Sequence, residues 1–171
     1  QICAGLQAGV SRQQLAGHLR NGTLEECLNI FSVQPGDCVM VPAGTVHAIG
    51  PGIVLVEIQQ QSNLTFRLCD WGRVGRDGQL RETHIEESLA CIDFHCGPVM
   101  PVTPCVLSDG DHLHEELVRD QHFVIQRHRT DQPFRIKTNN QFHILIVLDG
   151  LANMESSEGS QVLSRGATML I

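Results

Sequence analysis

The sequence has no tyrosine, a single lysine and a single tryptophan, and aromatic residues make up only 4% of the chain. Binding to a nucleic-acid backbone needs clustered Lys and Arg, and the formal net charge here is −7. We therefore exclude nucleic acid as a partner. No apolar run approaches the roughly 20 residues that a helix needs to span a bilayer, so we also predict no membrane span.

The seven cysteines are odd in number and form no Cys-x2-Cys pair. Secreted disulfide frameworks and thiolate zinc sites usually show even numbers or paired spacings. We therefore expect buried free thiols, as in a reducing cytoplasm. The chain also lacks an initiator methionine and stops within an apolar pattern, so we expect it to be a fragment of a longer protein.

A short helical insertion is predicted near the N-terminus, at about residues 11–31. Ser11 suits the N-cap of a first helix that stops near Gly22. Thr23 is predicted to cap a second short helix, with two glutamates in its first turn, that continues to Phe31.

Residues 34–73 read as tightly turned antiparallel β-structure. Two apolar segments, Cys38–Val41 and Ile53–Ile58, alternate there with Gly and Pro residues. A third helix is predicted at Ile85–Ala90, and a proline-marked extended connector follows it.

Beyond the connector the pattern returns to strands. Expected strands are 123–126, 134–137, 142–148 and 151–155, with a hairpin turn at Asp149-Gly150. We predict two units, residues 1–95 and 96–171, with the boundary at the connector.

The spacing Gly36-x5-Pro42-x-Gly44-x2-His47 resembles the second conserved motif of the cupin superfamily, which consists of small antiparallel jelly-roll barrels. Proline and glycine suit a tight corner, and the histidine would begin the next strand, pointing inward, where imidazole can bind a divalent metal. Pro51 stands where these proteins usually have an asparagine.

The longer string VPAGTVHAIGPGIVLVEIQQQSNLTFRLCDWGRVGRDG resembles the type I mannose-6-phosphate isomerases. Two residues depart from the family pattern, since Phe66 and Cys69 replace aromatic hydroxyls. The resemblance implies a mainly β fold of two cupin (jelly-roll) barrel units in tandem. It also implies a cytoplasmic, zinc-dependent isomerase that interconverts mannose 6-phosphate and fructose 6-phosphate through a cis-enediol.

Under this resemblance, His47 is the last of the zinc ligands, and the other ligands lie upstream of Gln1. The first barrel would then be present only as its C-terminal half. We therefore predict weak or no zinc binding and no activity for this chain alone. The second unit lacks histidines at the ligand positions of the family, which predicts a degenerate, metal-free cupin.

Two further residues are candidates for catalysis. Arg67 suits an anion, either the enediolate or the phosphate of a sugar phosphate, because guanidinium stays charged and presents a planar fork. Glu57 could hold or shuttle a proton on a strand face shared with Ile53 and Leu55. The identity of the general base stays open. The simpler alternatives are a salt-bridged Glu57 and an Arg67 that only pairs with Asp70.

His112-x-His114 also has a metal-binding spacing, but it sits in a turn-like composition, Ser108-Asp109-Gly110-Asp111, with no Glu and Gly following in the expected frame. We expect no metal there, and we expect Glu115 and Glu116 to lie on a solvated face. Two alternative functions stay open: a non-catalytic sugar-phosphate-binding or regulatory cupin, and a cupin enzyme of another class. The oligomeric state is not indicated.

Overall fold

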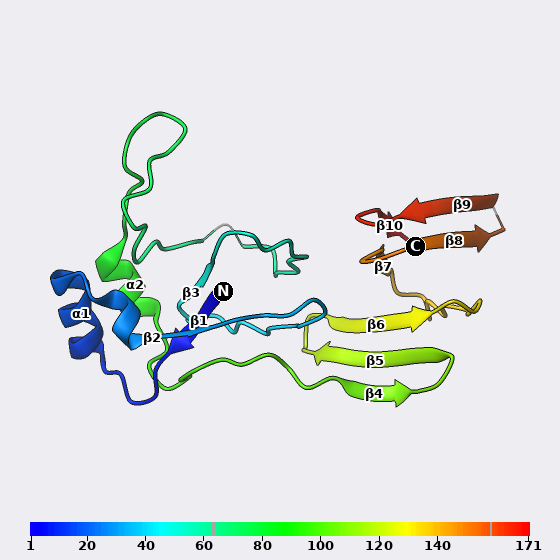
Figure 1. The fold of residues 1–171 in the computed structure, drawn as a ribbon, viewed down its shortest axis with the longest axis horizontal. Helices are drawn as coiled ribbons and strands as arrows, with labels where there is room; N and C mark the ends of the chain where they lie inside the picture. The colour runs from blue at the N-terminus through cyan, green and yellow to red at the C-terminus, as the bar shows by residue number, and fades with distance from the viewer. Residues whose placement is uncertain (63, 158) are drawn as a thin grey trace. The chain divides into compact units, whose positions relative to one another are not determined.

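The structure, a computed structural model, describes residues 1–62, 64–157 and 159–171. It divides into two compact units, Gln1–Thr130 and Asp131–Ile171. Ten strands and two short α-helices lie in the described residues (Figure 1), so the mainly β class with a helical insertion near the N-terminus is confirmed. Neither helix has the length or the apolar character needed to cross a membrane.

The first unit begins with a three-stranded antiparallel sheet in the order β2-β1-β3. Its strands are β1 (Ile2–Leu6), β2 (Leu28–Phe31) and β3 (His47–Ile49). The central strand is buried along most of its length. The register pairs Ala4 with His47, so the first residue of β3 lies beside the middle of the sheet.

The first predicted helix is present as α1 (Arg12–Asn21). Ser11 is its N-cap and forms a capping box with Gln14, which satisfies amide groups that have no partner within the helix. Gly22 ends the helix with φ of +69°, in the left-handed region that glycine adopts without strain. Local sequence signals therefore placed both ends of this helix.

The second predicted helix is wrong. Leu24–Cys27 forms only a single 3-10 turn, η1, and Leu28–Phe31 is strand β2. The side chain of Thr23 does not cap that turn; its Oγ1 lies 2.8 Å from Nδ1 of His18 instead. Pairing with β1 in the sheet overrides the helical pattern of the apolar residues.

The core of the first unit lies where α1, η1 and α2 (Ile85–Cys91) pack near strands β1 and β2 (Figure 1). Leu15 of α1 is fully buried, and Leu89 is the corresponding residue of α2. The predicted third helix is thus confirmed. The buried cluster consists of Cys3, Leu6, Leu15, Leu24, Cys27, Leu28, Leu68 and Leu89.

All seven cysteines are free thiols, but only Cys3 and Cys27 are buried. Burial, followed by the nearby Cys27 thiol, raises the pKa of Cys3 to about 11, so this thiol is unreactive. The expectation of buried thiols is wrong for Cys91 and Cys105, which are exposed.

The strands predicted at 38–41 and 53–58 are not formed. A strand needs a hydrogen-bonded neighbour, and no ladder partner for either segment lies in the described residues. Alternating apolar residues were therefore not enough to place strands here.

The proline-marked connector is extended, as predicted, and its first part binds to β1. The amide of Val99 donates to the carbonyl of Ala4 at 3.1 Å. The side-chain amide of Asn29 donates to the carbonyls of Ala4 and Val99, at 2.9 and 2.8 Å. Gly5 has φ of +84°, and a Cβ there would lie 2.2 Å from the carbonyl oxygen of Gly97. Only glycine permits this close approach.

A second antiparallel sheet of the first unit has the order β4-β5-β6. Its strands are β4 (Cys105–Ser108), β5 (His112–Arg119) and β6 (Val124–Thr130). Glu115 is 7% exposed and accepts a hydrogen bond of 2.8 Å from Nε of Arg127, so its expected place on a solvated face is wrong. This pairing compensates the desolvation of the carboxylate, and the hydrogen bond from Arg127 lowers the pKa of Glu115.

The described residues of the second unit form two pairs of antiparallel strands. β7 (Ile144–Ile146) pairs with β10 (Thr168–Leu170), and β8 (Leu151–Ser156) pairs with β9 (Gly159–Ser164). The hairpin predicted at Asp149-Gly150 is wrong, because the strands before and after it have different partners. Residues 134–137 form no strand. The two cupin units predicted to meet at residues 95 and 96 stay a prediction.

Candidate functional site

The corner that precedes His47 is built by Pro42 and Gly44. The amide of Thr45 donates to the carbonyl of Pro42 at 3.2 Å, which closes a four-residue turn. Gly44 has φ of +81°, and a Cβ there would lie 2.9 Å from the carbonyl oxygen of Cys91. The tight corner expected from the spacing is therefore present, and it packs against the end of α2.

His47 begins β3, as predicted, and its Nδ1 lies 3.0 Å from the carbonyl oxygen of Thr45. A carbonyl can only accept, so Nδ1 carries the proton and Nε2 keeps its lone pair. Metal-binding histidines are commonly oriented in this way by a second hydrogen bond. The side chain is exposed in this chain rather than directed inward.

The fit of these residues to zinc is partial. His47 has a suitable donor nitrogen, but the described residues contain no group of three or more His, Cys, Asp or Glu side chains that could hold a metal ion. A structural or catalytic zinc takes at least three protein ligands. His47 therefore fits zinc as one ligand of a larger set.

Glu57 lies in an exposed, irregular segment. Of the two apolar neighbours expected on a shared strand face, Leu55 is 45% exposed and Ile53 is only partly buried, and no strand forms at 53–58, so they do not enclose the carboxylate. Within the described part of the chain, Glu57 forms no salt bridge, which leaves its carboxylate available to a ligand.

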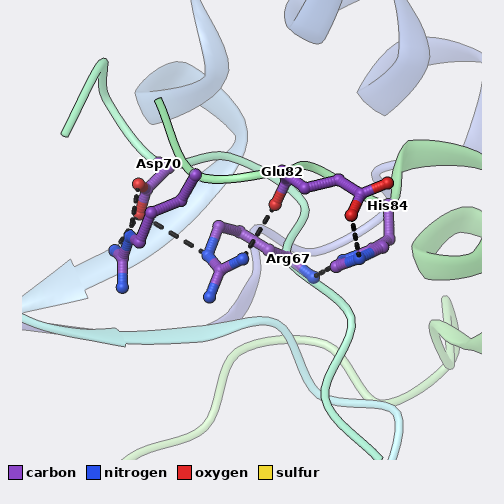
Figure 2. A network of polar contacts seen from close by, with 5 residues as sticks. Arg67, Asp70, Glu82 and His84 are labelled. Carbon is purple, nitrogen blue, oxygen red and sulfur yellow. Dashed lines mark hydrogen bonds and ion pairs between the residues drawn. The ribbon is translucent and has the colours of Figure 1, made fainter. Parts of the chain in front are cut away.

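Arg67 is held by polar contacts with three residues, Asp70, Glu82 and His84 (Figure 2). Its Nη1 donates to the carbonyl of Glu82 at 2.8 Å, and its backbone amide donates to Nδ1 of His84 at 3.1 Å. Its Nε lies 3.7 Å from Oδ1 of Asp70. The side chain remains 29% exposed, so a guanidinium of fixed position still reaches solvent.

Asp70 is not chiefly the partner of Arg67. Arg81 makes a bidentate contact with it, through Nε to Oδ2 at 2.7 Å and through Nη2 to Oδ1. The hydrogen bonds from Arg81 hold the pKa of Asp70 below its usual range, with smaller effects of the Arg67 and Arg73 charges. Because Arg81 already neutralises Asp70, the charge of Arg67 is left largely uncompensated for an anion.

The three predicted site residues are not joined to one another. No hydrogen bond or ion pair links any two of His47, Glu57 and Arg67 among residues 1–62, 64–157 and 159–171. A cavity of about 320 Å³ lies elsewhere, between α1 and α2. It is lined by Ala16, Leu19, Arg20, Ile85, Glu86 and Leu89, and so by none of the three.

Sequence reasoning missed the segment Glu82–His84, which provides the closest contacts of Arg67. No spacing pattern links His84 to a residue 17 positions away, so the sequence indicates no role for it at this site. The hydrogen bond between His84 and the Arg67 amide appears only when residues 67 and 84 are adjacent in the fold.

Three histidines that were not assigned to a site gather on the second sheet. His112 and His114 lie on β5 rather than in a turn, and the register pairs His114 with His128 of β6. Nε2 of His112 lies 2.9 Å from Nδ1 of His128, and the rings of His114 and His128 stack at 4.1 Å. Burial, followed by the charges of His114 and His112, lowers the pKa of His128 to about 4.

The comparisons with known proteins point to one group of enzymes. No family model matches the chain. Mannose-6-phosphate isomerase ManA from Bacillus subtilis is 32% identical over 163 residues, which is 94% of this chain and 51% of that protein. Mannose-6-phosphate isomerase from Streptococcus mutans is 27% identical over 161 residues, which is 94% of this chain and 50% of that protein.

A solved structure has the same fold. The crystal structure of the mannose 6-phosphate isomerase from Bacillus subtilis superposes with a TM-score of 0.88 at 23% identity, covering 99% of this chain and 53% of that chain. This match, together with the ten strands, confirms the predicted mainly β fold class; the cupin barrels themselves stay a prediction. The chain spans about half the length of the curated relatives it matches.

Proposed function

We propose that this chain, a homologue of the mannose-6-phosphate isomerases over 94% of its length, is part of an isomerase that interconverts mannose 6-phosphate and fructose 6-phosphate. The observation that carries the proposal is that the sequence similarity extends over 94% of this chain. The substrate would be a small sugar phosphate, and the location cytoplasmic, in keeping with seven unpaired thiols.

The reaction moves a proton between C1 and C2 and passes through a cis-enediol, so it needs a base and a positive group for the developing negative charge. Arg67 supplies such a group, because the carbonyl of Glu82 fixes its guanidinium. Its charge is largely uncompensated, since Asp70 is paired chiefly with Arg81. We propose that Arg67 binds the enediolate or the phosphate. Glu57 is exposed and forms no salt bridge with the residues that the structure describes, and we propose that it holds or moves a proton.

The metal of the intact enzyme is proposed to be zinc, bound through Nε2 of His47 together with ligands outside this chain. When bound, zinc would supply a Lewis acid at the sugar oxygens. What His47 itself contributes is a preset tautomer, because the carbonyl of Thr45 keeps the proton on Nδ1.

The test is a coupled assay on the full-length, zinc-loaded protein with mannose 6-phosphate as substrate. Conversion to fructose 6-phosphate that is lost on chelation and restored by zinc is expected. A well-folded, zinc-loaded protein that shows no conversion would refute the proposal. For the 171-residue chain alone we expect substoichiometric zinc by elemental analysis and no activity, and stoichiometric zinc would contradict this.

A second candidate function is a non-catalytic cupin that binds or senses sugar phosphates. The replacement of two expected hydroxyl groups by Phe66 and Cys69 favours it, because fewer hydrogen bonds would orient the sugar for turnover. Calorimetry with mannose 6-phosphate separates the two candidates. Binding without turnover by the zinc-loaded, full-length protein supports the second.

A further inference from the structure

We propose that His84 is a positioning residue for Arg67, fixing the backbone from which the guanidinium reaches its anion. The inference rests on the proposed function, in which Arg67 binds the sugar phosphate or the enediolate. It adds a residue that does not itself touch the substrate.

Residue 84 contacts Arg67 twice, through hydrogen bonds of opposite direction, and Figure 2 shows the one to the imidazole. The amide of Arg67 donates to Nδ1 of His84 at 3.1 Å, and the amide of His84 donates to the carbonyl of Arg67 at 2.8 Å. Two residues earlier, the carbonyl of Glu82 accepts from Nη1 of Arg67 at 2.8 Å. One short segment therefore holds the amide, the carbonyl and the guanidinium of the same arginine.

The contact determines the tautomer of His84. A backbone amide can only donate, so Nδ1 must be the unprotonated, accepting nitrogen, and the proton of the neutral ring is on Nε2. Oε2 of Glu82 lies 3.9 Å from Nε2, on the side that carries the proton. The centroid of the Phe66 ring lies 6.1 Å from the centroid of the His84 imidazole, so an aromatic neighbour also confines the imidazole.

His84 is itself anchored to the core. It is the N-cap residue of α2, and its carbonyl accepts from the amide of Ser88 at 2.8 Å. Ser88 and Leu89, in the next turn, are both 5% exposed. Movement of His84 would disturb the packing of α2, so the position of Arg67 is connected to the buried cluster through one histidine.

The geometry predicts which substitutions preserve the function. In asparagine, the side-chain oxygen can occupy the place of Nδ1 and accept the same hydrogen bond. In glutamine the oxygen is displaced by one carbon, to the place of Nε2, and alanine has no acceptor. His84→Asn should therefore retain the position of Arg67, whereas His84→Gln and His84→Ala should lose it.

The first experiment does not depend on activity. In the wild-type chain, nitrogen NMR of His84 should show an unprotonated Nδ1 and a protonated Nε2. Hydrogen exchange of the Arg67 amide should be about tenfold faster in His84→Ala and His84→Gln, and within about twofold of wild type in His84→Asn. The opposite tautomer, or equal exchange in all four proteins, would overturn the inference.

The second experiment uses the full-length protein. kcat/KM for mannose 6-phosphate should fall about tenfold in His84→Ala and His84→Gln and stay within about twofold in His84→Asn. If the wild-type protein does not convert the substrate, the proposed function fails, while the exchange data still decide the positioning role. Equal losses of activity in all three variants would count against positioning, even with a functional enzyme.

Discussion

Acidification should destabilise the first unit through the three histidines on the second sheet. His128 lies 2.9 Å, nitrogen to nitrogen, from His112 and stacks on His114 at 4.1 Å, and its pKa is lowered to about 4 from an ordinary value of 6.5. Between these values the unfolded chain binds a proton that the folded chain does not. Stability is therefore fully present above pH 6.5 and is lost as the pH falls towards 4.

The magnitude follows from the two pKa values. Between pH 7 and pH 5 they set a ceiling of about 2 kcal/mol on the loss in the free energy of unfolding. His128 is exposed on the sheet, so screening by solvent reduces the expected loss to about 1 kcal/mol or less. The carboxylates with lowered pKa values, Glu25, Asp70, Glu115 and Glu116, lose their stabilising effect only below about pH 4.5, outside this range.

The assay is urea unfolding of the chain, followed by circular dichroism, at pH 7, 6 and 5. Wild type should lose about 1 kcal/mol more over this range than His128→Gln, which has no group to protonate. His122→Gln, an exposed histidine outside the cluster, is the matched control and should behave as wild type. Identical pH profiles for wild type and His128→Gln would show that the reasoning is wrong.

Three further predictions concern the fold that holds the site, and urea unfolding at pH 7 measures each. Gly5→Ala should destabilise the chain by more than about 2 kcal/mol, because the new Cβ would lie 2.2 Å from the carbonyl oxygen of Gly97. Gly9 has a similar positive φ, but a Cβ there would meet no atom within 4 Å, so Gly9→Ala measures the backbone strain alone and should cost about 1 kcal/mol. Equal losses of stability in Gly5→Ala and Gly9→Ala would contradict the steric reason. Leu15→Ala should cost about 3 kcal/mol by leaving a cavity in the core, and a loss below about 1 kcal/mol would mean that the core collapses around it. Ser11→Ala should cost about 1 kcal/mol by removing the helix cap, and no loss would show that solvent replaces it.

Features that depend on neighbouring residues in the sequence could be predicted. The N-cap at Ser11 and the glycine after α1 are local signals, and both were found at the predicted positions. The Pro42-x-Gly44 corner is likewise set by the conformations that proline and glycine allow. His47 was therefore placed at the start of its strand before its partner strand was known.

Strand partners could not be predicted. Leu28–Phe31 has a helical pattern but pairs with β1, which lies more than 20 residues earlier in the sequence. The strands on either side of Asp149-Gly150 each have another partner. A period-two or period-3.6 pattern describes which side of an element is apolar, and it does not say which segment will cover that side.

The sequence by itself determined the family resemblance, the first helix and the corner that presents His47, since each depends on residue types at short, regular spacing. Only the tertiary structure decided how Arg67 is held. Its contacts with Glu82 and His84 join residues 15 and 17 positions apart. It also decided that Glu115 is buried against Arg127 instead of solvated. Contacts of this kind depend on how the chain folds back on itself. The sequence around a charged residue is the same whether water or an arginine from a distant strand compensates its charge.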